Sequence, residues 1–157
     1  MRWLKEEALG IQAVFLIFAA VAVNLLYVIV GLNVTASLGI DIPPASGAED
    51  LVDFSSLFLR SGDMLLEEVA FRLPLAILVW AAWPLIGIIA FAGFASVVFG
   101  AIHGSLWHVL FQGVGGFMFS LLFLKCGGLQ KRWVKALACA FTAHFLYNAT
   151  ILVLVTM

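Results

Sequence analysis

Charged residues are scarce in this 157-residue sequence, at 11%, whereas hydrophobic residues make up 64% and the mean hydropathy is +1.15. A soluble domain carries about 25% charged residues, and no soluble fold of this size could hide so much apolar surface. The formal net charge is only -1 and there is no run of basic residues. The sequence therefore indicates an integral membrane protein and excludes the clustered positive face that DNA or RNA binding requires.

Cysteine is also rare, and its spacing does not suggest a metal site. The two cysteines, Cys126 and Cys139, form no CxxC or Cys/His pattern, so we expect two free thiols that pack in the interior. The chain also lacks the Gly-x-x-x-x-Gly-Lys pattern of a phosphate-binding loop and the His-Glu-x-x-His pattern of zinc peptidases. We therefore predict no cofactor.

The long apolar stretches predict an all-α fold in which residues 1–157 form a single integral membrane domain. One crossing takes about 20 residues, so we expect a first span over residues 8–32 and a four-helix core over residues 64–157. Breaks within that core are marked by turn-forming or interfacial residues, and they fall at Trp83-Pro84, at His103-Gly104-Ser105 and in a short basic loop over residues 125–135. The result is a polytopic helical bundle of about five spans.

The region between the first span and the core, residues 33–63, is predicted to be an acidic loop. Within it, Leu51, Phe54, Leu57 and Phe58 recur at helical spacing. This spacing predicts a short amphipathic helix that lies in the membrane interface.

The basic residues predict the orientation. Arg2 and Lys5 precede the first span, and a second basic group lies between the last two spans. Five spans would place both groups on one side, and the positive-inside rule makes that side cytoplasmic. We expect the cytoplasmic (inner) membrane of a prokaryote, with the N-terminus in the cytoplasm. The first apolar segment is longer than that of a signal peptide, which favours an uncleaved anchor, with cleavage near Val34-Thr35-Ala36 as the alternative.

A few charged and polar residues fall within the predicted spans, where they are costly to keep. Glu68 and Arg72 are four residues apart on one helix, so they share a face and can pair. Glu67 points about 100° away around the helix and is not needed for that pair, which makes it the candidate for chemistry. His108 and Gln112, near a predicted interface, are given a structural or rim role.

Two further pairs have the same spacing on other segments, Phe99 with His103 and His144 with Asn148. If these faces converge with Glu67, then a carboxylate, two imidazoles and an amide surround one small volume. Such a set can hold a water against a base and stabilise an oxyanion, as amide hydrolysis requires. Glu67, His103 and His144 could equally ligate a divalent metal such as zinc.

Three motifs resemble those of the CAAX protease and bacteriocin-processing (CPBP, or Abi) family of intramembrane endopeptidases. In family order, the Glu-Glu-x-x-x-Arg, Phe-x-x-x-His and His-x-x-x-Asn motifs resemble Glu67-Glu68-Val69-Ala70-Phe71-Arg72, Phe99-Gly100-Ala101-Ile102-His103 and His144-Phe145-Leu146-Tyr147-Asn148. Each motif lies on a different apolar segment. A fainter likeness is to PrsW-type membrane proteases, which also carry paired glutamates and intramembrane histidines.

The resemblance implies roles for the motif residues. Glu67 would be the general base that activates water, and His103, backed by the Phe99 ring, would help to hold that water. The oxyanion site would be formed by His144 and Asn148. The helix that carries the base would be oriented by the pair of Glu68 and Arg72.

The sequence therefore predicts a CPBP-type intramembrane endopeptidase. It would use a glutamate-activated water to hydrolyse a peptide bond in a membrane-associated peptide or protein, with membrane lipid as its other partner. Two alternatives stay open. One is a non-catalytic membrane immunity or scaffold protein that uses the polar cluster only for fold specificity, and the other is a small proton-coupled transporter in which Glu67 and the histidines relay protons.

Overall fold

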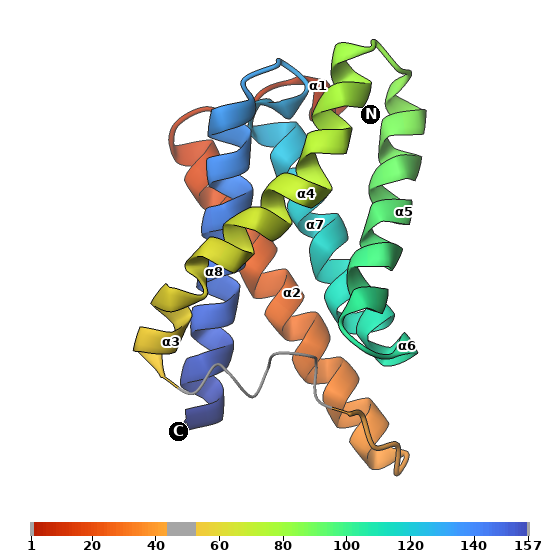
Figure 1. The fold of residues 1–157 in the computed structure, drawn as a ribbon, viewed down its shortest axis with the longest axis vertical. Helices are drawn as coiled ribbons and strands as arrows, with labels where there is room; N and C mark the ends of the chain where they lie inside the picture. The colour runs from red at the N-terminus through yellow and green to blue at the C-terminus, as the bar shows by residue number, and fades with distance from the viewer. Residues whose placement is uncertain (1, 44–52, 157) are drawn as a thin grey trace.

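The computed structural model describes residues 2–43 and 53–156, and these contain helices and no strand, as the predicted all-α fold requires. In chain order the elements are α1 (Arg2–Lys5), α2 (Ile11–Ser37), α3 (Phe54–Leu59), α4 (Ser61–Trp80), α5 (Leu85–Ile102), α6 (Leu106–His108), the π-helical segment η2 (Val109–Gly113), α7 (Val114–Phe123), the π-helical segment η3 (Leu124–Gly128) and α8 (Trp133–Thr156). The long helices run side by side as an up-and-down bundle, with α4 crossing in front of α7 (Figure 1).

Four segments in the described part of the chain are long and apolar enough to cross a membrane, which identifies an integral membrane protein. They are Ile11–Ser37, Leu85–Ile102, Leu106–Gly128 and Trp133–Leu154. The remaining long helix, α4, was predicted as the second span. It has 20 residues, but four of them are charged, so its composition does not mark it as a span although it packs against α5 and α8.

The first long helix extends further than predicted. It ends at Ser37 rather than near residue 32, so the start of the expected acidic loop is helical. The reason is local: Asn33, Thr35 and Ser37 donate side-chain hydrogen bonds of 2.7 to 3.1 Å to carbonyls three or four residues earlier. Polar side chains that bind their own helix in this way do not need a loop to satisfy them.

The predicted amphipathic helix in the acidic region is present as α3. Asp53 caps its N-terminus, because the carboxylate accepts a 2.7 Å hydrogen bond from the Ser56 N–H, and this bond lowers the pKa of Asp53. Leu57 is fully buried against Leu152 of α8. Leu51, the first residue of the predicted stripe, lies outside the described residues, and the position of α3 in the membrane interface stays a prediction.

The first two of the three breaks predicted inside the core are confirmed. The chain turns between α4 and α5 at residues 81–84, where Ala82 has a positive φ of 56°, and between α5 and α6 at residues 103–105, where Gly104 has a φ of 120°. The helices that flank the second turn pack backbone to backbone. A Cβ on Gly100 would lie 2.5 Å from Val109 Cα, so only glycine allows this approach.

The third break is shorter than the basic loop predicted over residues 125–135. The chain stays helical through Lys125, leaves helical geometry at Cys126 and Gly127, where Gly127 has a φ of 128°, and begins α8 at Trp133. Lys125 is 6% exposed because its ammonium donates hydrogen bonds to the carbonyls of Trp3 and Glu6 and lies 4.6 Å from the centre of the Trp3 ring. Hydrogen bonds to carbonyls and a contact with an aromatic ring stabilise the charged ammonium, so this lysine can remain buried.

The two basic groups of the sequence lie together at one end of the bundle. Glu7 forms ion pairs with Lys135 at 2.7 Å and with Arg132 at 3.2 Å, and these pairs hold the N-terminal segment against the start of α8. That both groups share one end agrees with the predicted topology. Cys126 and Cys139 are both free and buried, in one hydrophobic cluster, as predicted.

Candidate active site

The site is built on a charged pair in α4. Arg72 Nη2 donates a 3.1 Å hydrogen bond to Glu68 Oε1, and Nε lies 3.0 Å from Oε2 in a direction that is poor for a hydrogen bond. The two residues are 1% and 2% exposed. The pair predicted from the four-residue spacing is therefore present, and burial keeps its charges away from water.

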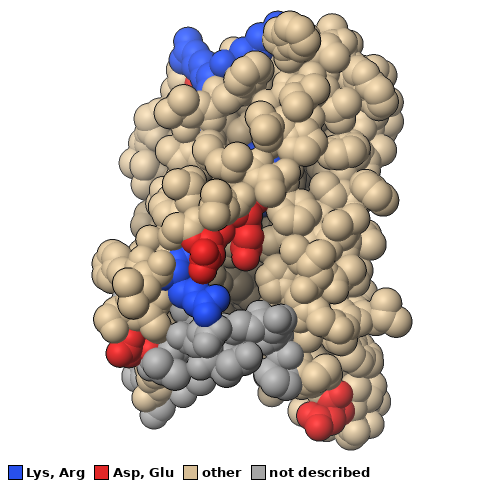
Figure 2. Space-filling model, in the orientation of Figure 1, with Lys and Arg blue, Asp and Glu red and all other residues tan. Residues whose placement is uncertain are grey.

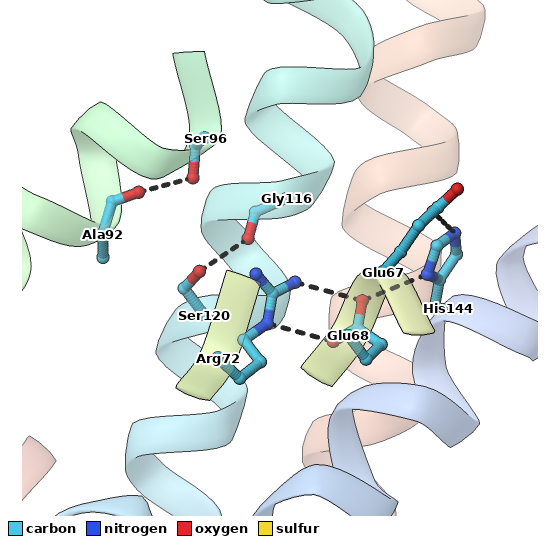
Figure 3. Close-up of polar contacts among 8 residues, drawn as sticks. All are labelled: Glu67, Glu68, Arg72, Ala92, Ser96, Gly116, Ser120 and His144. Atoms are coloured by element: carbon cyan, nitrogen blue, oxygen red, sulfur yellow. Dashed lines mark hydrogen bonds and ion pairs between the residues drawn. The ribbon is translucent and has the colours of Figure 1, made fainter. Parts of the chain in front are cut away.

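His144 of α8 reaches the same carboxylate. Its Nδ1 lies 3.1 Å from Glu68 Oε1, so one carboxylate oxygen accepts from both Arg72 and His144 (Figure 3). Because a carboxylate that pairs with arginine is an acceptor, Nδ1 must carry the proton of this bond. The ring atom left for other partners is therefore Nε2.

Glu67 lies on the other side of this imidazole. Its Oε2 is 4.0 Å from His144 Nε2, and its side chain is 34% exposed. As predicted, Glu67 is not part of the ion pair between Glu68 and Arg72. The His144 imidazole lies between the two carboxylates. Figure 2 shows acidic atoms at mid-height on this face of the molecule, beside a hollow in the surface. Nε2 of His144 thus faces the carboxylate of Glu67, which is partly exposed.

Two phenylalanines fix the plane of the His144 ring. Phe119 of α7 stacks on it with ring centres 5.5 Å apart, and Phe99 of α5 meets it edge-on at 6.2 Å. Gly116 makes room for this arrangement, because a Cβ there would lie 3.0 Å from the Phe99 ring. The aromatic wall excludes water from one side of the imidazole, which strengthens the electrostatic interactions on the other side.

His103 is near this group but is held separately. It ends α5, where its Nδ1 donates a 2.7 Å hydrogen bond to the Phe99 carbonyl, and its ring centre lies 4.7 Å from that of Phe99. A carbonyl can only accept, so Nε2 of His103 is left as an acceptor. Phe99 contacts both imidazoles, and no hydrogen bond between described residues joins His103 to Glu67 or His144.

Asn148 follows His144 by one turn of α8. Its Nδ2 lies 3.5 Å from Met64 Sδ on α4, which is a weak partner for an amide donor. Glu68 with His144 and Met64 with Asn148 are thus successive contacts of two antiparallel helices. The carboxamide of Asn148 therefore lies one helical turn from the His144 imidazole.

The metal-ligand set considered from the sequence is not assembled in this arrangement. Within residues 2–43 and 53–156, no three His, Cys, Asp or Glu side chains lie close enough to hold one ion.

The predicted structural role is confirmed for His108, and the structural or rim role of Gln112 stays a prediction. His108 is 5% exposed, and its Nδ1 accepts the Ser105 N–H at 3.1 Å in a capping box. Gln112 has a buried Oε1 without a hydrogen-bond partner in the described part of the chain.

The comparison with known families agrees with the three motifs. Residues 54–150, more than half of the chain, match the family described as type II CAAX prenyl endopeptidase Rce1-like. The matched region runs from α3 into α8 and contains all the residues of the candidate site. No curated protein and no solved structure matches the chain.

Proposed function

The chain belongs to the Rce1-like family of CAAX prenyl endopeptidases, and from this we propose that it hydrolyses a peptide bond in a membrane-associated peptide or protein with a water activated by Glu67. One observation carries the proposal. His144 lies between two carboxylates, 3.1 Å from buried Glu68 and 4.0 Å from accessible Glu67. The family supports peptidase activity, and it supports neither the scaffold nor the transporter alternative.

In the proposed reaction, Glu67 removes a proton from a water, and the resulting hydroxide attacks the carbonyl carbon of the substrate peptide bond. Before the attack, the other O–H of that water donates a hydrogen bond to His103 Nε2, the nitrogen that its bond to the Phe99 carbonyl leaves free. When the tetrahedral intermediate collapses, Glu67 returns the proton to the leaving amine. The carboxylate is thereby regenerated and the two products balance the substrate and the water.

The negative charge on the carbonyl oxygen needs donors aimed at it. We assign this role to the Asn148 amide and to the Nε2–H of His144 in its imidazolium form, in which both ring nitrogens are donors. The two groups lie one turn apart on α8. Glu68 and Arg72 do not touch the substrate in this scheme. They position His144, because the bond from Nδ1 to Glu68 fixes the direction of the ring.

The basic end of the bundle also supports a location. We propose a prokaryotic cytoplasmic membrane with the N-terminus in the cytoplasm, because the basic residues of the short segments meet at the end where α1 lies. The scaffold for catalysis would then be embedded in the bilayer.

The experiment compares variants produced in a bacterial host, using the host's own membrane proteins as the substrate pool. New protein N-termini are identified by mass spectrometry. We expect them with the wild type and with Asp63→Asn, a matched control in which an exposed carboxylate of α4 is removed. With Glu67→Gln they should fall by about 10²- to 10⁴-fold. Equal cleavage by Glu67→Gln and wild type, or no cleavage by the wild type, would refute the proposal.

A further inference from the structure

One end of the bundle concentrates the positive charge and the tryptophans of the chain. Six of the eight Lys and Arg residues belong to α1, η3 and the segment up to the first turn of α8, against only Glu6 and Glu7. Four of the five tryptophans are in or next to the helix ends that meet there, at Trp3, Trp80, Trp83 and Trp133. Basic atoms gather at the corresponding end in Figure 2. Tryptophan and basic residues mark the level of the lipid headgroups.

A cavity of about 470 Å³ opens at this end, between α1, the turn joining α4 to α5, and the segment after η3. Part of its lining is polar, from Lys5 and Gln130, and part is apolar, from Val79, Leu85 and Ile88, with Trp83 beside them. Among the described residues, none that lines it is acidic. A site that is cationic on one side and apolar on the other suits an amphiphile with an anionic head.

Among the described residues that line the cavity, Lys5 provides the cation that is available to such a ligand. Lys125 already donates hydrogen bonds to carbonyls of the N-terminal segment, and Arg132 and Lys135 are both paired with Glu7. Lys5, in contrast, forms no ion pair with any described residue. Gln130 fixes the local backbone, because its Nε2 donates a 2.9 Å hydrogen bond to the Lys5 carbonyl.

We propose that this cavity binds an anionic phospholipid. The phosphate lies against Lys5, and the first part of an acyl chain lies against Val79, Leu85 and Ile88, with Trp83 at the level of the glycerol. The bound lipid joins three segments that are distant in sequence and so stabilises this end of the bundle. Charge complementarity selects an anionic lipid over a zwitterionic one, since a basic residue near a membrane surface contributes about 1 kcal/mol to such binding.

This site is separate from the proposed peptidase site. Val79 follows Glu67 by twelve residues of α4, a distance of about 18 Å along the helix axis. Lipid binding can therefore be tested without any peptide substrate, and its outcome does not depend on the peptidase proposal.

The test uses the full-length protein in neutral detergent, titrated with phosphatidylglycerol, phosphatidylcholine or inorganic phosphate while its thermal midpoint is followed. The variants are Lys5→Gln and the matched control Lys131→Gln, an exposed lysine at the same end that does not line the cavity. We expect phosphatidylglycerol alone to raise the midpoint of the wild type. Lys5→Gln should bind it about fivefold more weakly, while Lys131→Gln should resemble the wild type.

Three results would overturn the proposal. An equal effect of Lys5→Gln and Lys131→Gln would show that only the overall charge of this end matters. An equal response to phosphatidylcholine, or no response to phosphatidylglycerol, would show that no anionic lipid is selected. The same shift with inorganic phosphate alone would show a simple anion site.

Discussion

Replacing Arg72 with methionine is expected to lower the free energy of unfolding by about 3 to 5 kcal/mol, because it removes the guanidinium that pairs with the buried carboxylate of Glu68. The two side chains are 2% and 1% exposed, and their charged atoms approach to 3.0 Å. At an effective dielectric constant of about 20, two charges at this separation attract each other by about 5 kcal/mol. Methionine keeps much of the arginine volume, so lost packing contributes little.

The pair is best measured as a double-mutant cycle, with Arg72→Met, Glu68→Gln and the double variant unfolded by sodium dodecyl sulfate in mixed micelles and followed by circular dichroism. The double variant has no stranded charge, so it should be more stable than Arg72→Met alone. A cost below about 1 kcal/mol for Arg72→Met, or a double variant whose loss equals the sum of the single losses, would show that the pair does not hold α4 as described.

Two further predictions concern the packing and the N-terminal anchor. Gly100→Ala should lower stability by about 1 to 3 kcal/mol because its Cβ would clash with Val109, whereas Gly93→Ala, in open space on the same helix, should be neutral or stabilising by up to about 1 kcal/mol; equal thermal midpoints would contradict this. The hydrogen bond from Lys135 lowers the pKa of Glu7, so its contribution to stability is complete at neutral pH and is lost as the pH falls through the ordinary glutamate range near about 4.3 toward the lowered value. Glu7→Gln should remove that part of the acid limb in a thermal-midpoint profile, and an unchanged profile would refute it.

Features set by local chemistry could be predicted from the sequence. The pair of Glu68 and Arg72 follows from a four-residue spacing on one helix, and the turn at Trp83-Pro84 follows from the restriction that proline places on its neighbour. Both are present, because each depends on residues within one turn of each other. The membership of the family was also predictable, since it rests on three short motifs in order.

The ends of elements were harder to predict, for a physical reason. Lys125 and Thr35 are polar, and hydropathy assigns such residues to loops. In the structure both are helical, because Lys125 binds carbonyls of α1 and Thr35 binds a carbonyl of its own helix. Hydropathy measures the cost of leaving a polar group unpaired and cannot anticipate a partner that is distant in sequence or provided by the backbone.

The partner of His144 could not be derived from spacing. The sequence identifies Glu67 as the carboxylate left over by the ion pair, but it does not say which glutamate meets the imidazole first. That choice depends on the rotation of α4 about its axis, which packing against α8 sets, and the shorter contact is to Glu68. Arg72 therefore acts on the proposed chemistry through two intermediaries, Glu68 and His144.

This arrangement also limits how charge can move during the proposed reaction. The group of Arg72, Glu68, His144 and Glu67 contains two carboxylates and one guanidinium, so its total charge is zero when His144 is an imidazolium with a proton on both ring nitrogens. A total charge of zero is the least costly inside a membrane. When Glu67 takes the proton of the water, the negative charge passes to the oxyanion while His144 still donates to it. The net charge of the buried group and substrate together does not change at this step, so no uncompensated charge has to be created below the headgroups.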